Sequence, residues 1–178
     1  MAATTAVVVP LSQIVIRDGL TRIAGAELAG LWQAMWKLSE THLLMLTTTL
    51  SLYFLPRLAE IREGGELRRE IAKGYRFVIP LVVTTAAAIY LLREPLTLAL
   101  FSPAFLPMAQ ALSWQLLGDV LKIASWIPAY TMISHARTRL YVGTELAFAA
   151  LVTVACLAGA RAWGLPGAAA GYAATYAI

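Results

Sequence analysis

Charge and cysteine are both scarce in this sequence, and each scarcity excludes a class of protein. Only 13% of the 178 residues are Asp, Glu, Lys or Arg, whereas 60% are hydrophobic. Ordinary soluble domains contain roughly 25% charged residues, so the composition indicates a protein of the lipid bilayer. The single cysteine, Cys156, excludes an intrachain disulfide and suggests no metal site.

Catalytic and cofactor motifs are also missing. The sequence has no GxSxG, no HExxH, no Walker loop and no paired carboxylates in a polar loop of the kind a membrane glycosyltransferase needs. We therefore predict that the chain is not an enzyme and takes no metal or cofactor. The net charge is +4, but the basic residues lie between apolar segments, which argues against nucleic acid as a partner.

Apolar segments recur along the chain, and several reach the ~20 residues that an α-helix needs to cross the hydrocarbon core. The sequence therefore predicts an all-α, polytopic membrane helix bundle in one domain, 1–178. The six predicted spans are approximately 1–17, 31–56, 74–93, 105–134, 140–161 and 165–178. Because the chain starts and stops inside apolar segments, we expect it to be a fragment of a longer multispanning protein.

The connections between these segments alternate in basic charge, which predicts their sides of the membrane. The second and third segments are joined by a connection with six basic residues: Arg57, Arg62, Arg68, Arg69, Lys73 and Arg76. The fourth and fifth are joined by one with Arg137 and Arg139, whereas the remaining connections have one or two basic residues each. The positive-inside rule places these two connections, between the second and third segments and between the fourth and fifth, in the cytoplasm. Acidic residues within 57–76 favour a solvated loop there over the alternative, a helix lying on anionic lipid.

Two charges lie near the middle of the fourth segment. Asp119 and Lys122 are three residues apart, with no other Asp, Glu, Lys, Arg or His between 104 and 134. They share a helical face with Gln115 and Trp126. A charge at the bilayer centre costs about 2.5–3.5 kcal/mol on insertion scales, so such groups must face protein or water.

The second segment repeats this pattern with Lys37 and Glu40, and Glu145 adds a carboxylate in the fifth. One interpretation is that each pair neutralises itself and joins helices. The other, which we favour, is that the two polar stripes line a shared aqueous cavity. The candidate cavity and substrate residues are Lys37, Glu40, Gln115, Asp119, Lys122 and Glu145.

Histidine and tryptophan give weaker signals. His42 is adjacent to the polar stripe, where it could titrate, and His135 is predicted to be interfacial. Trp32 and Trp36 are predicted to anchor the chain at the membrane interface. Trp126 lies deeper, where it packs in the core or stacks on a sugar.

Four stretches together resemble a known family: LYFLPRLAEI (52–61), RREIAKGYRFVIPLV (68–82), WQLLGDVLKI (114–123) and GAAAGYAATY (167–176). They are similar, in order and spacing, to the C-terminal half of Wzx-type flippases, most of all to the lipid III type that serves enterobacterial common antigen synthesis. This family belongs to the multidrug/oligosaccharidyl-lipid/polysaccharide exporter superfamily, whose members have two pseudo-symmetric six-helix bundles around a central cavity.

The resemblance implies a function and partners. It implies that the chain is the second bundle of a bacterial inner-membrane flippase, which moves an undecaprenyl-pyrophosphate-linked oligosaccharide, such as lipid III or an O-antigen unit, to the periplasmic leaflet by alternating access. The partners would be the N-terminal bundle, the bilayer and other polysaccharide assembly proteins. Lys37 and Lys122 would meet the pyrophosphate, while Asp119 and Glu40 keep the cavity polar or bind a coupling proton or cation. The alternatives are a drug or lipid II exporter of the same superfamily and a non-transporting membrane assembly subunit.

Overall fold

The structure, a computed structural model, describes residues 2–61, 64–134 and 138–177. Its elements, in chain order, are α1 (Ala2–Glu60), α2 (Gly64–Leu91), α3 (Arg93–Leu100), the 3₁₀ turn η1 (Pro103–Phe105), α4 (Met108–Ser134) and α5 (Thr138–Tyr176). No β-strand occurs in the described ranges, so the predicted all-α class is confirmed.

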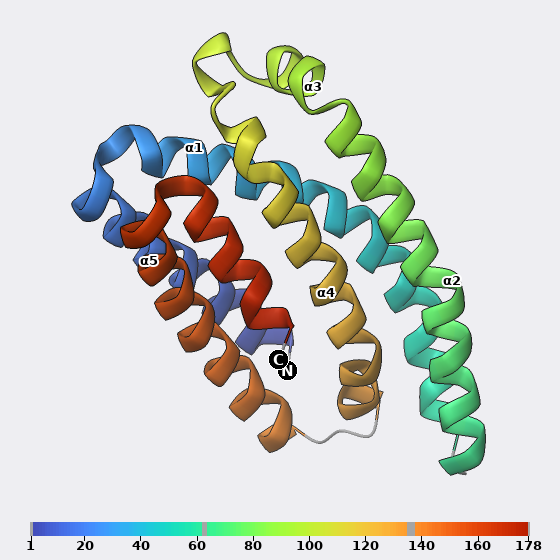
Figure 1. Ribbon diagram of the computed structural model, residues 1–178. Coiled ribbons are helices and arrows are strands. Elements are labelled where there is room, and N and C mark those ends of the chain that lie inside the picture. The colour runs from blue at the N-terminus through green and yellow to red at the C-terminus, as the bar shows by residue number, and fades with distance from the viewer. Residues whose placement is uncertain (1, 62–63, 135–137, 178) are drawn as a thin grey trace.

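Two of the helices fold back on themselves at a glycine (Figure 1). α1 breaks at Gly25, where φ is 88°, and α5 breaks at Trp163 and Gly164, where φ of Gly164 is 64°. Glycine adopts such positive φ values without the steric cost that a Cβ imposes. Each of the six predicted segments therefore overlaps one uninterrupted stretch of helix: 2–24, 26–60, 64–91, 108–134, 138–162 and 165–176. That each stretch crosses a membrane stays a prediction.

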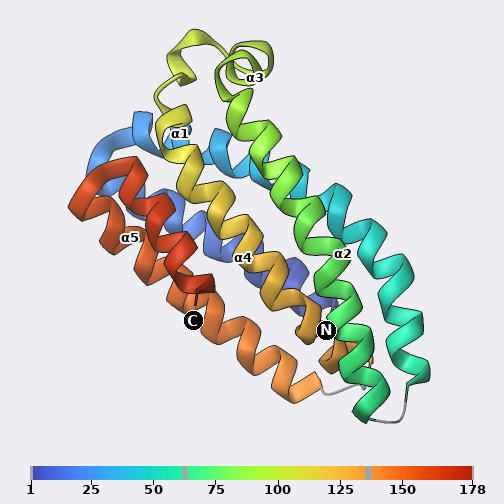
Figure 2. The ribbon, with the colours of Figure 1, turned by 45° about the vertical axis from the view of Figure 1, so that its right-hand side comes forward.

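The reversals of the chain alternate between the two ends of the bundle (Figures 1 and 2). The breaks at Gly25 and Gly164 lie at the same end as α3. The end of α1 and the start of α2 lie at the opposite end, with the end of α4 and the start of α5. This arrangement agrees with the alternation of basic charge, although the side of the membrane stays a prediction. Arg62, His135 and Arg137 lie outside the described residues.

The outer surface is apolar, as the composition predicts for a membrane protein. Large hydrophobic side chains such as Leu52, Phe77, Leu91 and Val154 are exposed on the bundle. α2 and the stretch Arg139–Tyr176 are long and apolar enough to cross a membrane, judged by length and composition over the described residues. The fold is therefore a membrane helix bundle, because such a surface is stable against lipid and costly against water.

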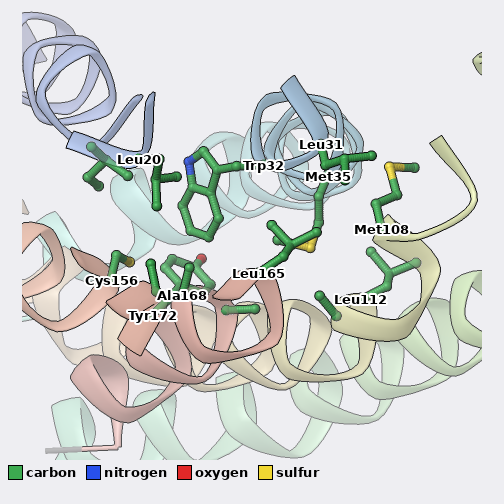
Figure 3. Close-up of a cluster of buried hydrophobic side chains, with 14 of the residues drawn as sticks. Leu20, Leu31, Trp32, Met35, Met108, Leu112, Cys156, Leu165, Ala168 and Tyr172 are labelled. Carbon is green, nitrogen blue, oxygen red and sulfur yellow. The ribbon is translucent and has the colours of Figure 1, made fainter. Parts of the chain in front are cut away.

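The largest buried cluster joins α1, α4 and α5 (Figure 3). Trp32 and Met35 of α1 pack against Leu112 of α4 and Tyr172 of α5. The two arms of α5 touch through their backbones, because a Cβ on Gly159 would lie 2.0 Å from the carbonyl oxygen of Gly167. Small residues of this kind drive helix association in lipid, where close van der Waals packing replaces the hydrophobic effect.

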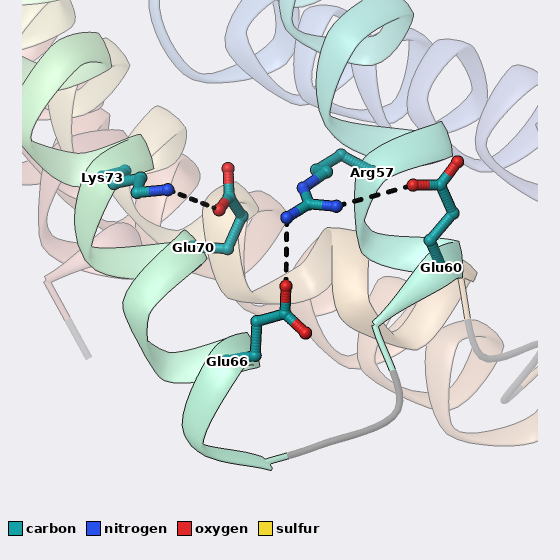
Figure 4. Close-up of polar contacts among 5 residues, drawn as sticks. All are labelled: Arg57, Glu60, Glu66, Glu70 and Lys73. Carbon is teal, nitrogen blue, oxygen red and sulfur yellow. Dashed lines mark hydrogen bonds and ion pairs between the residues drawn. The ribbon is translucent and has the colours of Figure 1, made fainter.

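The connection 57–76 is helical over most of its length, which corrects the expected solvated loop. Arg57 lies in the last turn of α1, and α2 already begins at Gly64. A second buried cluster, with Leu58 of α1, Val78 and Val82 of α2 and Ile127 of α4, fixes this end of the bundle. Three of the acidic residues that favoured a loop, Glu60, Glu66 and Glu70, are instead engaged in ion pairs between and within these helices (Figure 4). Glu63 lies outside the described residues.

Candidate functional site

Asp119 of α4 lies at the centre of the bundle, fully buried. The hydroxyl of Ser39, on α1, donates to its carboxylate, with the Ser39 oxygen 2.7 and 2.8 Å from the two carboxylate oxygens. The Tyr172 hydroxyl, on α5, donates to Oδ1 at 2.9 Å. The carboxylate therefore joins three helices through neutral donors, which satisfy a group that would be costly to bury alone.

Gln115 extends this polar network by one turn of α4. Its Nε2 donates to the Ser39 oxygen at 3.2 Å, so that Ser39 accepts from one side chain and donates to the other. The Oε1 of Gln115 is buried and has no hydrogen-bond partner among the described residues. A buried acceptor without a donor costs about 1–3 kcal/mol, which marks this position as a polar site that is not fully satisfied.

Gly118 is the local reason that Tyr172 can reach Asp119. A Cβ at position 118 would lie 2.4 Å from Cδ1 of Tyr172, inside the space that the ring occupies. The absence of a side chain at Gly118 thus leaves the space on α4 that the ring occupies, directly beside the carboxylate; we call this space the seat of the ring. On α5, Tyr172 sits within a run of alanines and glycines that lets its arm approach closely.

Lys122 occupies an aromatic cage one turn further along α4. Its ammonium lies 5.3 Å from the ring centroid of Trp36, 5.1 Å from Trp126, 5.9 Å from Tyr172 and 5.7 Å from Tyr176. Only 8% of the residue is exposed. Ring quadrupoles attract a cation, by about 2 kcal/mol or more when the cation is desolvated, so the cage holds the charge inside the bundle.

The electrostatic environment of Lys122 brings several predicted residues together. Three of the predicted carboxylates lie on the helices that pack around it: Asp119 on α4, Glu145 on α5 and Glu40 on α1. Asp119 and Lys122, both described, do not approach within the 4.0 Å of an ion pair. The two residues therefore form no direct ion pair, and whether they have a structural or a transport role stays a prediction.

Lys37 and Glu40 do form such a pair, at 2.9 Å, on an open surface. Their side chains are 70% and 50% exposed and line a groove of about 410 Å³ between the two arms of α1. Trp36 lines the same groove and also forms one wall of the cage around Lys122. One indole ring therefore separates the groove from the buried ammonium.

The predicted polar stripes thus occupy two compartments rather than one open cavity. Lys37 and Glu40 face the groove, whereas the Gln115, Asp119 and Lys122 side chains are buried behind it. Glu145 is partly buried on α5. The reason for this difference is the ring of Trp36, together with the close packing of α5 on α4.

Sequence reasoning missed four members of the site: Ser39, Trp36, Tyr172 and Tyr176. Trp36 had been assigned to the membrane interface with Trp32, yet Trp32 is only 1% exposed and Trp36 is partly buried against Tyr172. The available signal was the spacing of Tyr172 and Tyr176, four residues apart on one helical face within small residues. His42 instead contacts Thr85 of α2, with Nε2 2.8 Å from the hydroxyl oxygen.

The fold and the site together define an α-helical membrane protein with charged groups buried at the centre of its bundle. No family model matches the chain, and the comparison with solved structures gave no match. Over all 178 residues the chain is 33% identical to the lipid III flippase of Escherichia coli (strain K12), and equally to that of Shigella flexneri. The chain spans 43% of the length of these relatives. The resemblance drawn from the four sequence stretches is thereby confirmed. The matched region is a little less than half the length of each relative, in line with the expected half.

Proposed function

We propose that this chain is the C-terminal six-helix half of a multi-pass flippase of the bacterial inner membrane. The flippase carries an undecaprenyl-pyrophosphate-linked oligosaccharide from the cytoplasmic to the periplasmic leaflet by alternating access. The observation that supports this most is the identity to lipid III flippases along the whole chain. No covalent bond of the substrate changes in such transport, so the chain is not an enzyme.

The substrate class explains why cations lie inside a membrane bundle. A lipid-linked pyrophosphate brings negative charge to the edge of the hydrocarbon, where it needs charge-assisted hydrogen bonds. Lys37 is available first, because it is exposed in the groove and its partner Glu40 is also half exposed. An exposed ion pair of this kind contributes little to stability, so a phosphate can replace the carboxylate at small cost.

Lys122 is the second cation on this path, behind the Trp36 ring. Its charge is held by four aromatic rings rather than by a close carboxylate, because Asp119 is occupied by Ser39 and Tyr172. Cation–π contacts are weaker than charge-assisted hydrogen bonds to phosphate. Movement of the indole would therefore let the ammonium exchange its rings for a phosphate oxygen.

The test is glycan export by the full-length protein in flippase-deficient cells. We expect Lys122→Gln, and the double variant with Asp119→Asn, to reach normal abundance in the membrane and to export strongly reduced amounts of glycan, with Lys37→Gln behaving similarly. Glu94→Gln, at an exposed carboxylate remote from the groove, is the matched control and should export normally.

Two outcomes would count against the proposal. If the unaltered full-length protein does not restore export of any lipid-linked glycan, the flippase assignment is wrong. If it restores export and the double variant does so equally well, the assignment stands, but Asp119 and Lys122 have only a structural role.

A further inference from the structure

The first turns of α2 sort their charges by face. Glu66 points towards α1, where Arg57 donates to it at 3.0 Å, and Arg57 also pairs with Glu60 at 3.5 Å (Figure 4). Glu70 is turned inward, with a side chain only 5% exposed, and accepts from Lys73 at 3.1 Å. Glu60 and Glu66 are therefore paired with Arg57, and of these three acidic residues only Glu70 pairs with a basic residue of the outer face, Lys73.

The outer face of the same turns is basic. Arg68, Arg69 and Arg76 are exposed, and none of the described acidic residues forms an ion pair with them. Positions 69, 73 and 76 follow the i, i+4, i+7 spacing of one helical stripe, so Lys73 adds its 63% exposed side chain to the row. The rotation of the helix is fixed, because Tyr75 donates to the carbonyl of Ala124 on α4 and Val78 is buried.

We propose that this stripe and the neighbouring exposed Arg68, which together we call the α2 basic face (Arg68, Arg69, Lys73 and Arg76), bind the phosphate headgroups of anionic phospholipids. The face fits a lipid because its character changes abruptly along the helix. Directly after Arg76 the exposed residues are apolar, with Phe77 73% exposed and Val83 46% exposed. A basic stretch that continues into a lipid-exposed apolar stretch places its cations at headgroup depth.

The dimensions agree with this depth. Arg68 and Arg76 are eight residues apart, about 12 Å along the helix at ~1.5 Å per residue. The polar region of a bilayer leaflet is of the order of 5–8 Å thick. Arg76, next to the apolar stretch, therefore reaches headgroup phosphates, while Arg68, at the far end of the face, extends into water. Arginine presents a planar fork that matches phosphate oxygens, which makes it well suited to this role.

The inference does not depend on the transported substrate, because no residue of α2 lines the groove or contributes a ring to the cage around Lys122. The test measures which lipids gather next to this face in bilayers that contain the full-length protein. Ala72 is exposed between the arginines, and the native Cys156 is buried, so a fluorophore on Ala72→Cys reports this position alone. The probes are phosphatidylglycerol and phosphatidylcholine, each with a quencher on the acyl chain near the headgroup.

We expect phosphatidylglycerol to quench the fluorophore at a lower mole fraction than phosphatidylcholine does. Loss of charge in Arg69→Gln with Arg76→Gln should reduce this preference by up to about fivefold per arginine at low ionic strength. The preference should also vanish near 1 M salt, where the Debye length is about 3 Å. Arg69→Lys with Arg76→Lys should keep most of it.

The control is Arg22→Gln with Arg161→Gln, which removes the same formal charge from exposed arginines at the opposite end of the bundle, one of which, Arg22, pairs with Asp18 at 2.9 Å. This control should leave the preference unchanged. Equal quenching by the two lipids in the unaltered protein would overturn the inference. So would an equal loss in the control and in the Arg69, Arg76 variant, because the effect would then reflect net charge rather than this face.

Discussion

Gly118→Ala tests the geometry of the site with one methyl group. The added Cβ would lie 2.4 Å from Cδ1 and 2.5 Å from Cε1 of Tyr172, and 3.1 Å from Cα of Ala173. Ordinary contact begins at 3.4 Å, so the ring must retreat by about 1 Å. Tyr172 is fully buried and the third contact is to backbone, so neither neighbour can move freely.

The cost can be worked out from these contacts. Overpacking of a filled core costs about 1–3 kcal/mol. A weakened hydrogen bond from Tyr172 to Asp119 adds roughly 0.6 kcal/mol, the average for side-chain bonds in a membrane bundle. Alanine regains up to about 1 kcal/mol of helix propensity. We therefore expect a net destabilisation of about 1–3 kcal/mol.

The assay is thermal unfolding of the purified protein in detergent, compared with Gly143→Ala. Gly143 is an exposed helical glycine with nothing within 4 Å of a Cβ, so its replacement should be neutral or slightly stabilising. We expect Gly118→Ala to melt several degrees lower. Combining it with Tyr172→Ala, which removes the ring, should cost little more than Tyr172→Ala alone. Equal melting of the two glycine variants would refute the proposed seat of the ring.

Three further predictions concern the site and its orientation. Tyr172→Phe should keep the cage around Lys122 but lose one donor to the carboxylate, reducing thermal stability by about 0.6 kcal/mol, whereas no change would show that this bond is not formed. Trp36→Ala should open the groove to Lys122, so that an anionic fluorescent lipid binds the purified protein more tightly, and weaker binding would show that the ring does not act as a barrier. A cysteine at Gly65 should resist a membrane-impermeant thiol reagent in intact cells, and ready labelling would reverse the predicted orientation.

Much of the fold follows from the sequence, because long apolar segments indicate helices that are surrounded by lipid rather than water. The charged interruptions and the prolines bound the apolar segments, and the six uninterrupted helical stretches overlap the predicted ranges. The sharp reversal inside α5 was also foreseeable, since Gly164 is followed by Pro166 between two apolar runs. The helical start of α2 could not be predicted, because the acidic residues that suggested a solvated loop form ion pairs whose partners cannot be read from the charge composition.

The site is harder to derive because its partners come from distant positions. Asp119 and Lys122 were identified by the cost of charge in a bilayer, which is a local property of one helix. Their contacts to Ser39 and Tyr172 are 80 and 53 residues away along the chain. Periodicity places two residues on one face but does not say whether that face meets water, a carboxylate or four aromatic rings.

The position of Tyr172 and Tyr176 near the end of α5 has a consequence for the order of synthesis. α1 and α4 precede α5 in the chain, so Ser39 and both tryptophan walls of the cage are synthesised before the tyrosine donor and the two tyrosine walls. The second arm of α5 then docks through Gly167 and closes the network. A nascent chain that stops before this arm lacks the Tyr172 donor to Asp119 and two of the four rings around Lys122, so its buried charges are less well compensated in the bilayer than those of the longer chain.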